Sequence, residues 1–164
     1  MWIGLHEERA GAWAWVTGEP LASPSWNLGE PNNFGGAEAC AEWLAVGGTW
    51  NDTRCEQEQG YLCQAPSPGG KLTCSGRAFT LGATRYCLQS EAQLAWPDAK
   101  RACEATSGTL AVLRTPEENL ALREALGFVL LELWFAPVAE AVLRRSTSSR
   151  ARSPRCCTPW TRGS

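Results

Sequence analysis

The pattern of apolar and polar positions predicts short strands in the first part of the chain. An apolar run at 2–5, a polar turn at 6–12 and alternating Trp13 and Trp15 predict a hairpin with both tryptophans in the core. His6, the only histidine, falls in that turn and is expected at the surface. Further strands are predicted at 40–44, 49–52 and 60–64. The stretch 20–36 has little periodicity, which predicts a long loop of the kind that commonly carries function.

Helical patterns follow in the second part of the chain. The predicted elements are a hairpin between Cys74 and Cys87, a helix from Trp96 to a stop at Ser107-Gly108, a strand at 109–113, and a helix from Thr115 through Leu126. Pro97 in the first turn and Asp98 beside it support the first helix. Its predicted buried face consists of Trp96, Ala99 and Cys103. A capping box at 115–118 supports the second helix.

Composition and charge then bound the organisation. The chain has 164 residues, of which 44% are hydrophobic, so one domain with a core is expected. Residues 65–71 are rich in proline and glycine, which predicts a linker. Residues 127–164 carry six arginines against Glu132 and Glu140, which predicts a disordered basic tail. The net charge of −2 therefore leaves −6 on residues 1–126, and this acidic part argues against nucleic acid as a partner.

The cysteines indicate the compartment. Eight cysteines without a C-x-x-C pair predict disulfides, which persist in oxidising surroundings, so an extracellular protein or ectodomain is expected. The start at Met1 has neither a basic region nor a long apolar run, which predicts no signal peptide and a chain that begins inside a larger protein. The apolar run 128–143 is interrupted by charges and is shorter than the roughly 20 residues of a bilayer span, so no membrane helix is expected.

Candidate chemistry gathers between residues 30 and 52. Three carboxylates and two amides stand on polar, glycine-rich loops there: Glu30, Asn32, Glu38, Asn51 and Asp52. Their oxygens suit Ca²⁺, which takes about six to eight oxygen ligands in irregular geometry, although each residue alone is also consistent with a solvated acidic loop. The single histidine and the absence of Gly-x-Ser-x-Gly, His-Glu-x-x-His and phosphate-loop motifs argue against an enzyme, and no catalytic residues are expected.

The combination of Glu30-Pro31-Asn32, Glu38 and Trp50-Asn51-Asp52 resembles the calcium and sugar site of C-type lectin domains. The resemblance implies an α+β, C-type lectin-like fold with a long loop region, two helices and short antiparallel sheets. It implies a cis peptide bond before Pro31, which turns its two neighbours towards one ion. In the family, the five candidate residues hold Ca²⁺ and hydrogen-bond two sugar hydroxyls. Glu-Pro-Asn goes with mannose-type sugars, whereas Gln-Pro-Asp goes with galactose.

The same resemblance divides the chain into two halves. Residues 1–64 resemble the C-terminal half of one domain, with the calcium and sugar loop, and residues 72–126 resemble the N-terminal half of the next domain. Such an order is similar to that of tandem proteins like the mannose receptor. Residues 65–71 would link the halves, and residues 127–164 depart from the family pattern.

The family pattern also implies disulfides. It pairs Cys40 with Cys55 and Cys74 with Cys87. Cys63 normally pairs with a first-helix cysteine, which here would lie before the start of the chain. Cys103 is the first-helix cysteine of the following half. Two arrangements remain open: one circularly permuted domain closed by Cys63–Cys103, or two fragments with reactive thiols.

Calcium-dependent binding of mannose-type glycans is the main functional hypothesis from the sequence. Many relatives of the family keep the fold and bind proteins instead, so a non-sugar protein-interaction module is an alternative. A truncated lectin fragment without function is another. A folded chain that does not bind calcium would favour these alternatives.

Overall fold

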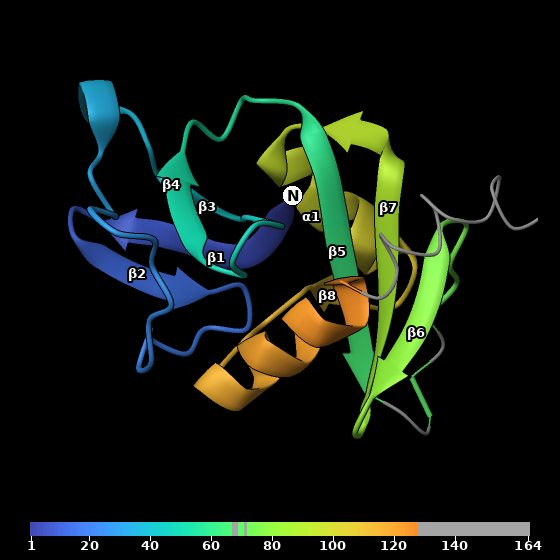
Figure 1. Ribbon diagram of the computed structural model, residues 1–164. Helices are drawn as coiled ribbons and strands as arrows, with labels where there is room; N and C mark the ends of the chain where they lie inside the picture. Colours follow the sequence, from blue (N-terminus) through green and yellow to red (C-terminus); the bar gives the residue numbers. More distant parts are fainter. Residues whose placement is uncertain (67–68, 71, 128–164) are drawn as a thin grey trace, which may run out of the picture. The chain divides into compact units, whose positions relative to one another are not determined.

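The strands join into one mixed sheet. The structure is a computed structural model that describes residues 1–66, 69–70 and 72–127. The strand order is β4-β3-β1-β5-β7-β6, with β2 paired to β1 and β8 paired to β5 (Figure 1). The strands are β1 (Trp2–Arg9), β2 (Ala12–Trp15), β3 (Cys40–Trp43), β4 (Trp50–Thr53), β5 (Gln59–Pro66), β6 (Arg77–Leu81), β7 (Thr84–Leu94) and β8 (Thr109–Leu110). Residues 1–126 form one compact unit.

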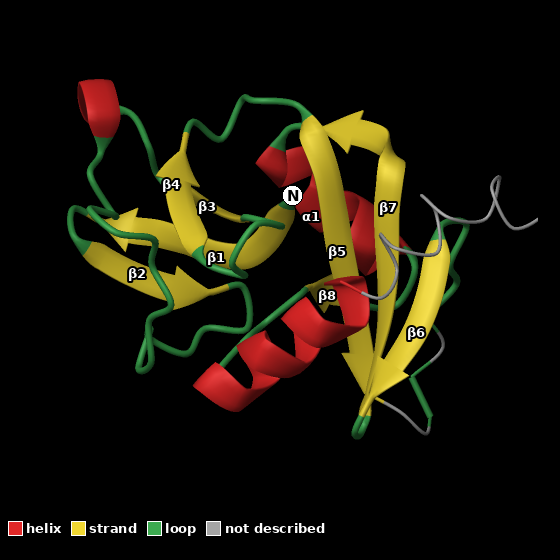
Figure 2. Cartoon of the chain, viewed as in Figure 1, coloured by secondary structure: helices red, strands yellow, loops and turns green. Residues whose placement is uncertain are grey.

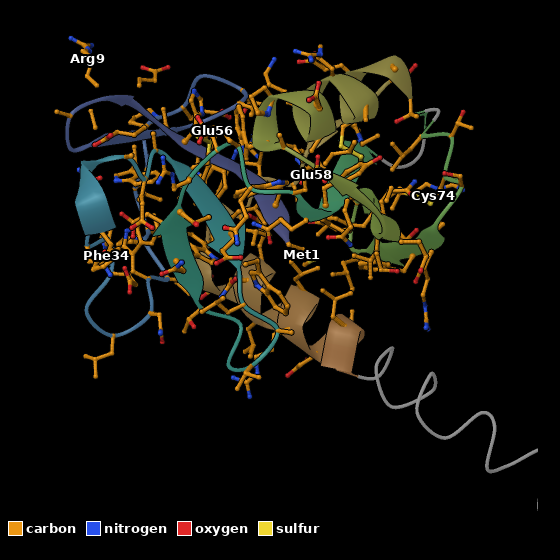
Figure 3. The ribbon with its side chains drawn as sticks, turned by 90° about the horizontal axis from the view of Figure 1, so that it is seen from above. Met1, Arg9, Phe34, Glu56, Glu58 and Cys74 are labelled. Carbon is orange, nitrogen blue, oxygen red and sulfur yellow. A yellow bond between two sulfur atoms is a disulfide. The ribbon has the colours of Figure 1, made fainter. Side chains whose placement is uncertain are left out.

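Two α-helices lie on opposite sides of this sheet. They are α1 (Trp96–Ala105) and the helix at 116–127, which is unlabelled and orange in Figure 1. Seen from above in Figure 3, the sheet lies between them. The long loop adds only a short 3-10 turn, η1 (Phe34–Gly36), drawn in red in Figure 2. The predicted α+β class with two helices is therefore confirmed.

The helices follow the sequence signals. The buried residues of α1 are Trp96, Ala99 and Cys103, as predicted. At the second helix, the backbone N–H of Glu118 donates to Thr115 Oγ1 at 3.2 Å, which is half of a capping box. The Glu118 carboxylate accepts from the backbone N–H of Arg114 at 2.6 Å, one residue before the usual partner.

The sheet differs from the expected short antiparallel sheets in two ways. The described strands form a single sheet, and Trp2 of β1 pairs in parallel with Tyr61 of β5. β1 also continues to Arg9, so the prediction of a turn at 6–12 is wrong for most of that stretch. His6 consequently lies within β1, half-buried, with its ring centroid 5.0 Å from that of Trp96. Burial lowers the pKa of His6.

The predicted strand at 109–113 is shorter than expected. β8 ends at Leu110, because the N–H of Val112 donates to the side-chain Oε1 of Gln64 at 2.9 Å instead of to a backbone carbonyl. Ala111, the residue after β8, still forms backbone hydrogen bonds with β5 and β1. Its N–H donates to Leu62 O at 2.8 Å, and its carbonyl accepts from Gly4 N at 2.7 Å.

Three disulfides close the unit. They are Cys40–Cys55, Cys63–Cys103 and Cys74–Cys87, the pairs that the family pattern implies when the two halves complete each other. Cys63–Cys103 spans 40 residues and joins β5 to α1. Two indole hydrogen bonds in the core also join the two halves of the chain. Trp2 Nε1 donates to Leu94 O at 2.7 Å, and Trp96 Nε1 donates to Ile3 O at 2.9 Å.

The linker and the tail are described only in part. β5 runs through Ala65 and Pro66, which composition assigned to the linker, and Ala65 pairs with Arg85 of β7. The expectation of a basic tail at 127–164 lies, beyond Gly127, outside the described residues. Within residues 1–66, 69–70 and 72–127, no helix is both long enough and apolar enough to cross a membrane.

Candidate functional site

The long loop is attached to β4 by backbone and aromatic contacts. The N–H of Trp50 donates to Ser25 O at 2.9 Å, and the N–H of Asn27 donates to Trp50 O at 2.7 Å. Trp26 contacts Trp50 edge-on at a ring-centroid distance of 5.8 Å, and Trp13 contacts Trp26 at 4.8 Å. Trp26 of the loop therefore packs between Trp13 and Trp50, next to the strand positions of Asn51 and Asp52.

Asp52 is the buried centre of the candidate site. Asp52 is only 1% exposed to solvent. Oδ1 accepts from the backbone N–H of Asn32 at 3.1 Å, and Oδ2 accepts from the backbone N–H of Asn33 at 2.8 Å. Both donors follow the Glu30-Pro31 peptide bond, which is cis. β4 thus holds the turn of the loop through one carboxylate.

Glu30 completes this turn as a second carboxylate. Its Oε1 accepts from Asn32 Nδ2 at 3.0 Å, and its Oε2 accepts from the backbone N–H of Asn32 at 3.1 Å. Burial raises the pKa of Glu30, and the neighbouring Asp52 raises it further, while the two donations from Asn32 act in the opposite direction. Asp52 is therefore close enough to disfavour the negative charge of Glu30.

Glu38 lies on the far side of the 3-10 turn. Its Oε2 accepts from the backbone N–H of Phe34 at 2.6 Å, and its own N–H donates to Asn33 Oδ1 at 3.1 Å. Figure 3 shows Phe34 on this turn, at the edge of the unit. Glu38 and Asp52 share the lining of a cavity of about 170 Å³, together with Glu7, Gly11, Trp13, Pro31 and Asn33.

Asn51 has a different partner from the other candidates. It lies opposite Glu42 in the β3–β4 pair, and its Nδ2 donates to Glu42 Oε1 at 3.0 Å. The structure therefore brings Glu30, Asn32 and Asp52 into direct contact and places Glu38 in the adjoining cavity. It does not place Asn51 in hydrogen-bond contact with these residues in the part of the chain that it describes.

The candidate residues suit a hard cation by their chemistry, but they are not assembled around one point. Within the described ranges, no group of three or more His, Cys, Asp or Glu side chains has the spacing of a metal site. Every candidate donor is nevertheless an oxygen, as Ca²⁺ requires. Burial and the nearby charge of Asp52 both raise the pKa of Glu30, and a bound cation would offset both effects on the ionised Glu30 carboxylate. The donor set therefore fits Ca²⁺.

Two supporting residues have no motif in the sequence. Glu42 could have been found by counting the hairpin register back from the Gly47-Gly48 turn, because residues opposite each other across a turn follow from its length. Asn119 gives no local signal. It lies in the helix at 116–127, and its Oδ1 accepts from the indole nitrogens of Trp43 at 3.0 Å and Trp50 at 3.1 Å.

Comparisons with known proteins relate the first part of the chain to one family. Residues 1–65 match the model of the family described as Lectin C-type domain. "C-type lectin domain family 4 member M" of Gorilla gorilla gorilla is 46% identical over 71 residues, which cover 40% of this chain and 18% of that protein. "Hepatic lectin" of Gallus gallus is 45% identical over 71 residues, covering 41% of this chain and 33% of that protein.

A shorter relative gives the same picture. "C-type lectin lectoxin-Lio3" of Erythrolamprus poecilogyrus is 38% identical over 73 residues, which cover 43% of this chain and 45% of that protein. This chain thus spans less than half the length of each of these relatives. No solved structure is significantly similar to it. Residues 1–65 are therefore similar to the C-type lectin family, and the match to the family model ends at residue 65.

Proposed function

We propose that the chain binds carbohydrate through a Ca²⁺ ion held where the long loop meets β4. The residues that would hold the ion are Glu30, Asn32, Glu38, Asn51 and Asp52. The observation that carries the proposal is the contact between the Glu30-Pro31-Asn32 turn and Asp52, which brings two carboxylates together. Burial raises the pKa of Glu30, and the charge of Asp52 raises it further. A divalent cation stabilises such a pair.

The sugar of this proposal is a mannose-type residue. When bound, Ca²⁺ would supply coordination positions for two neighbouring sugar hydroxyls. The carboxylates of Glu30 and Glu38 would accept hydrogen bonds from the hydroxyl groups, and the amides of Asn32 and Asn51 would donate hydrogen bonds to the hydroxyl oxygens. The Glu-Pro-Asn sequence supports mannose over galactose, and the lectins among the relatives support carbohydrate as the class of ligand.

The functional unit of the proposal is residues 1–126 as one domain with its halves in permuted order. The Cys63–Cys103 disulfide and the pairing of β5 with β7 support it, because both join the family-matched segment to the segment at 72–126. Three disulfides also support an extracellular protein or ectodomain. The proposed role is binding, with no catalytic step.

Calcium titration of the folded full chain tests the ion. The expected dissociation constant is on the order of 0.1 to 1 mM, as in extracellular modules. Mannose-agarose in millimolar Ca²⁺ should then retain the chain, and EDTA should release it. Glu30→Gln combined with Asn32→Asp should shift retention towards galactose-agarose.

Glu56→Gln is the matched control, because Glu56 is an exposed carboxylate that is not one of the five candidate residues. It should leave retention on mannose unchanged. A folded chain that shows no calcium binding at 10 mM, on the order of ten times the upper constant, would overturn the proposal. That result would favour a protein-interaction module or a lectin fragment without function.

A further inference from the structure

Glu42 is an acidic residue beside the candidate site that is not itself one of the proposed calcium ligands. It lies on β3, directly opposite Asn51 of β4, and accepts from Asn51 Nδ2 at 3.0 Å. Both residues are half-buried. The next pair along the two strands is Ala41 and Asp52, so Glu42 is one position away from the buried centre of the site.

This hydrogen bond fixes which way the Asn51 amide is turned. An ionised carboxylate only accepts hydrogen bonds, whereas an asparagine side chain has one donor end and one acceptor end. With Nδ2 towards Glu42, the amide is attracted, and a flip would bring Oδ1 against the carboxylate. Glu42 thus leaves Oδ1 free of that contact and leaves the second Nδ2 hydrogen for another acceptor.

We propose that Glu42 is a positioning residue for the calcium and sugar site, because it holds the Asn51 amide with its oxygen available to the cation and one N–H available to a sugar hydroxyl. This inference rests on the proposed function. It adds a residue that touches neither ion nor sugar and acts through Asn51. Outer partners of this kind typically change metal affinity by about 10- to 100-fold when removed.

A different role for Glu42 has to be separated from this one. The amino group of Met1 donates to Trp43 O at 3.1 Å. Burial lowers the pKa of that amino group, and the charge of Glu42 raises it. Glu42 could therefore serve as a counter-charge for the amine. A counter-charge requires the carboxylate, whereas a positioning residue requires only a hydrogen-bond acceptor.

Two substitutions in the full chain distinguish these roles. Glu42→Ala removes both the charge and the acceptor, and calcium affinity should fall about tenfold. Glu42→Gln removes the charge and keeps an acceptor oxygen, so it should retain most of the affinity. Glu56→Ala is the matched control and should bind calcium like the wild type. If Glu42→Ala does not fold, Glu42→Val replaces it, since valine favours a strand.

A second measurement needs no calcium. The side-chain NH₂ resonances of Asn51, assigned by their loss in Asn51→Asp, should be protected from hydrogen exchange in the calcium-free wild type. Protection should be lost in Glu42→Ala and kept in Glu42→Gln and Glu56→Ala. This readout follows the Asn51 amide itself, so it separates positioning from a general effect on folding.

The outcomes are distinct. Wild-type affinity in Glu42→Ala, or an unprotected Asn51 amide in the wild type, would overturn the inference. Equal losses in Glu42→Ala and Glu42→Gln would also overturn it, because they indicate a requirement for charge alone. A wild-type chain that binds no calcium but has an Asn51 amide protected through Glu42 would overturn the proposed function and leave the Glu42–Asn51 contact established.

Discussion

Single polar side chains hold this site together at points where backbone pairing ends. The Asp52 carboxylate accepts hydrogen bonds from two backbone N–H groups of the loop. The Glu30 carboxylate accepts hydrogen bonds from the backbone N–H and the side-chain amide of Asn32. The carboxylates that would bind a cation are therefore engaged by the protein itself in its absence. Any cation has to compete both with these donors and with protons.

Proton competition gives a prediction at the residue scale. The pKa of Glu30 lies above its ordinary value of 4.5 when no cation is present. As pH falls through that raised pKa, protonated Glu30 should exclude Ca²⁺, and apparent calcium affinity should fall by up to about tenfold per pH unit. Calorimetric titrations from pH 7.5 to 5 at constant ionic strength measure it.

The calcium-free chain should respond with the opposite sign. A carboxyl whose folded pKa is raised binds its proton more readily in the folded state, so this group adds stability as pH falls through the raised pKa. Glu30→Gln should flatten both pH dependences, and Glu56→Gln should flatten neither. Calcium affinity that stays constant from pH 7.5 to 5 would contradict the assignment of Glu30.

At the scale of elements, β4 is held from three sides. β3 pairs with it along its length, the long loop pairs with Trp50, and the helix at 116–127 reaches it through Asn119. Asn119 is 9% exposed, and its Nδ2 also donates to Gly48 O at 2.7 Å, in the turn between β3 and β4. This helix therefore fixes the turn from which Asn51 and Asp52 extend.

Removing the Asn119 side chain should destabilise the unit. Asn119→Ala leaves two indole N–H groups and one carbonyl without their partner, and a cost of roughly 3 kcal/mol in the free energy of unfolding is expected. Urea unfolding followed by tryptophan fluorescence measures it. Leu120→Ala, at a half-exposed neighbouring position, should cost less than about 1 kcal/mol. A cost for Asn119→Ala below that of Leu120→Ala would contradict this role.

Local sequence patterns predicted which helices and strands form, but they did not predict the contacts between those elements. Alternating Trp13 and Trp15 gave β2, and Pro97 gave the start of α1, because both signals act within a few residues. The extension of β1 to Arg9 was missed, since polar residues on the solvent-facing end of a strand look like a turn. The oxygen-bearing residues were identifiable by type, whereas the Asn119 contacts join residues 69 to 76 positions apart and follow only from the fold.

At the scale of the whole unit, the disulfide between Cys63 and Cys103 joins the two halves of the chain. It closes a 40-residue loop, whereas Cys74–Cys87 closes a 13-residue loop inside the second half. Loop-closure entropy grows with loop length, so the longer loop contributes more to stability. The proposal of one permuted domain depends on this long loop.

Removal of that disulfide gives the prediction at this scale. Cys63→Ala with Cys103→Ala should lower the free energy of unfolding by roughly 4 kcal/mol, against roughly 3 kcal/mol for Cys74→Ala with Cys87→Ala. Urea unfolding of the oxidised variants measures both, and disulfide mapping by mass spectrometry verifies the remaining pairs. Two separate transitions in the wild type, or no loss in the first variant, would mean that the halves fold independently.

Four tryptophans in contact with one another lie next to the candidate site. Trp13 lines the cavity beside Glu38 and Asp52, and ring contacts connect it through Trp26 and Trp50 to Trp15, with centroids 4.8, 5.8 and 5.6 Å apart. Indoles this close share their electronic excitation, so the set gives a coupled near-ultraviolet circular dichroism signal. If the loop binds an ion as proposed, its rearrangement should change the surroundings of Trp13, the first ring of the series. Near-ultraviolet circular dichroism should then report occupancy of the site without an added label.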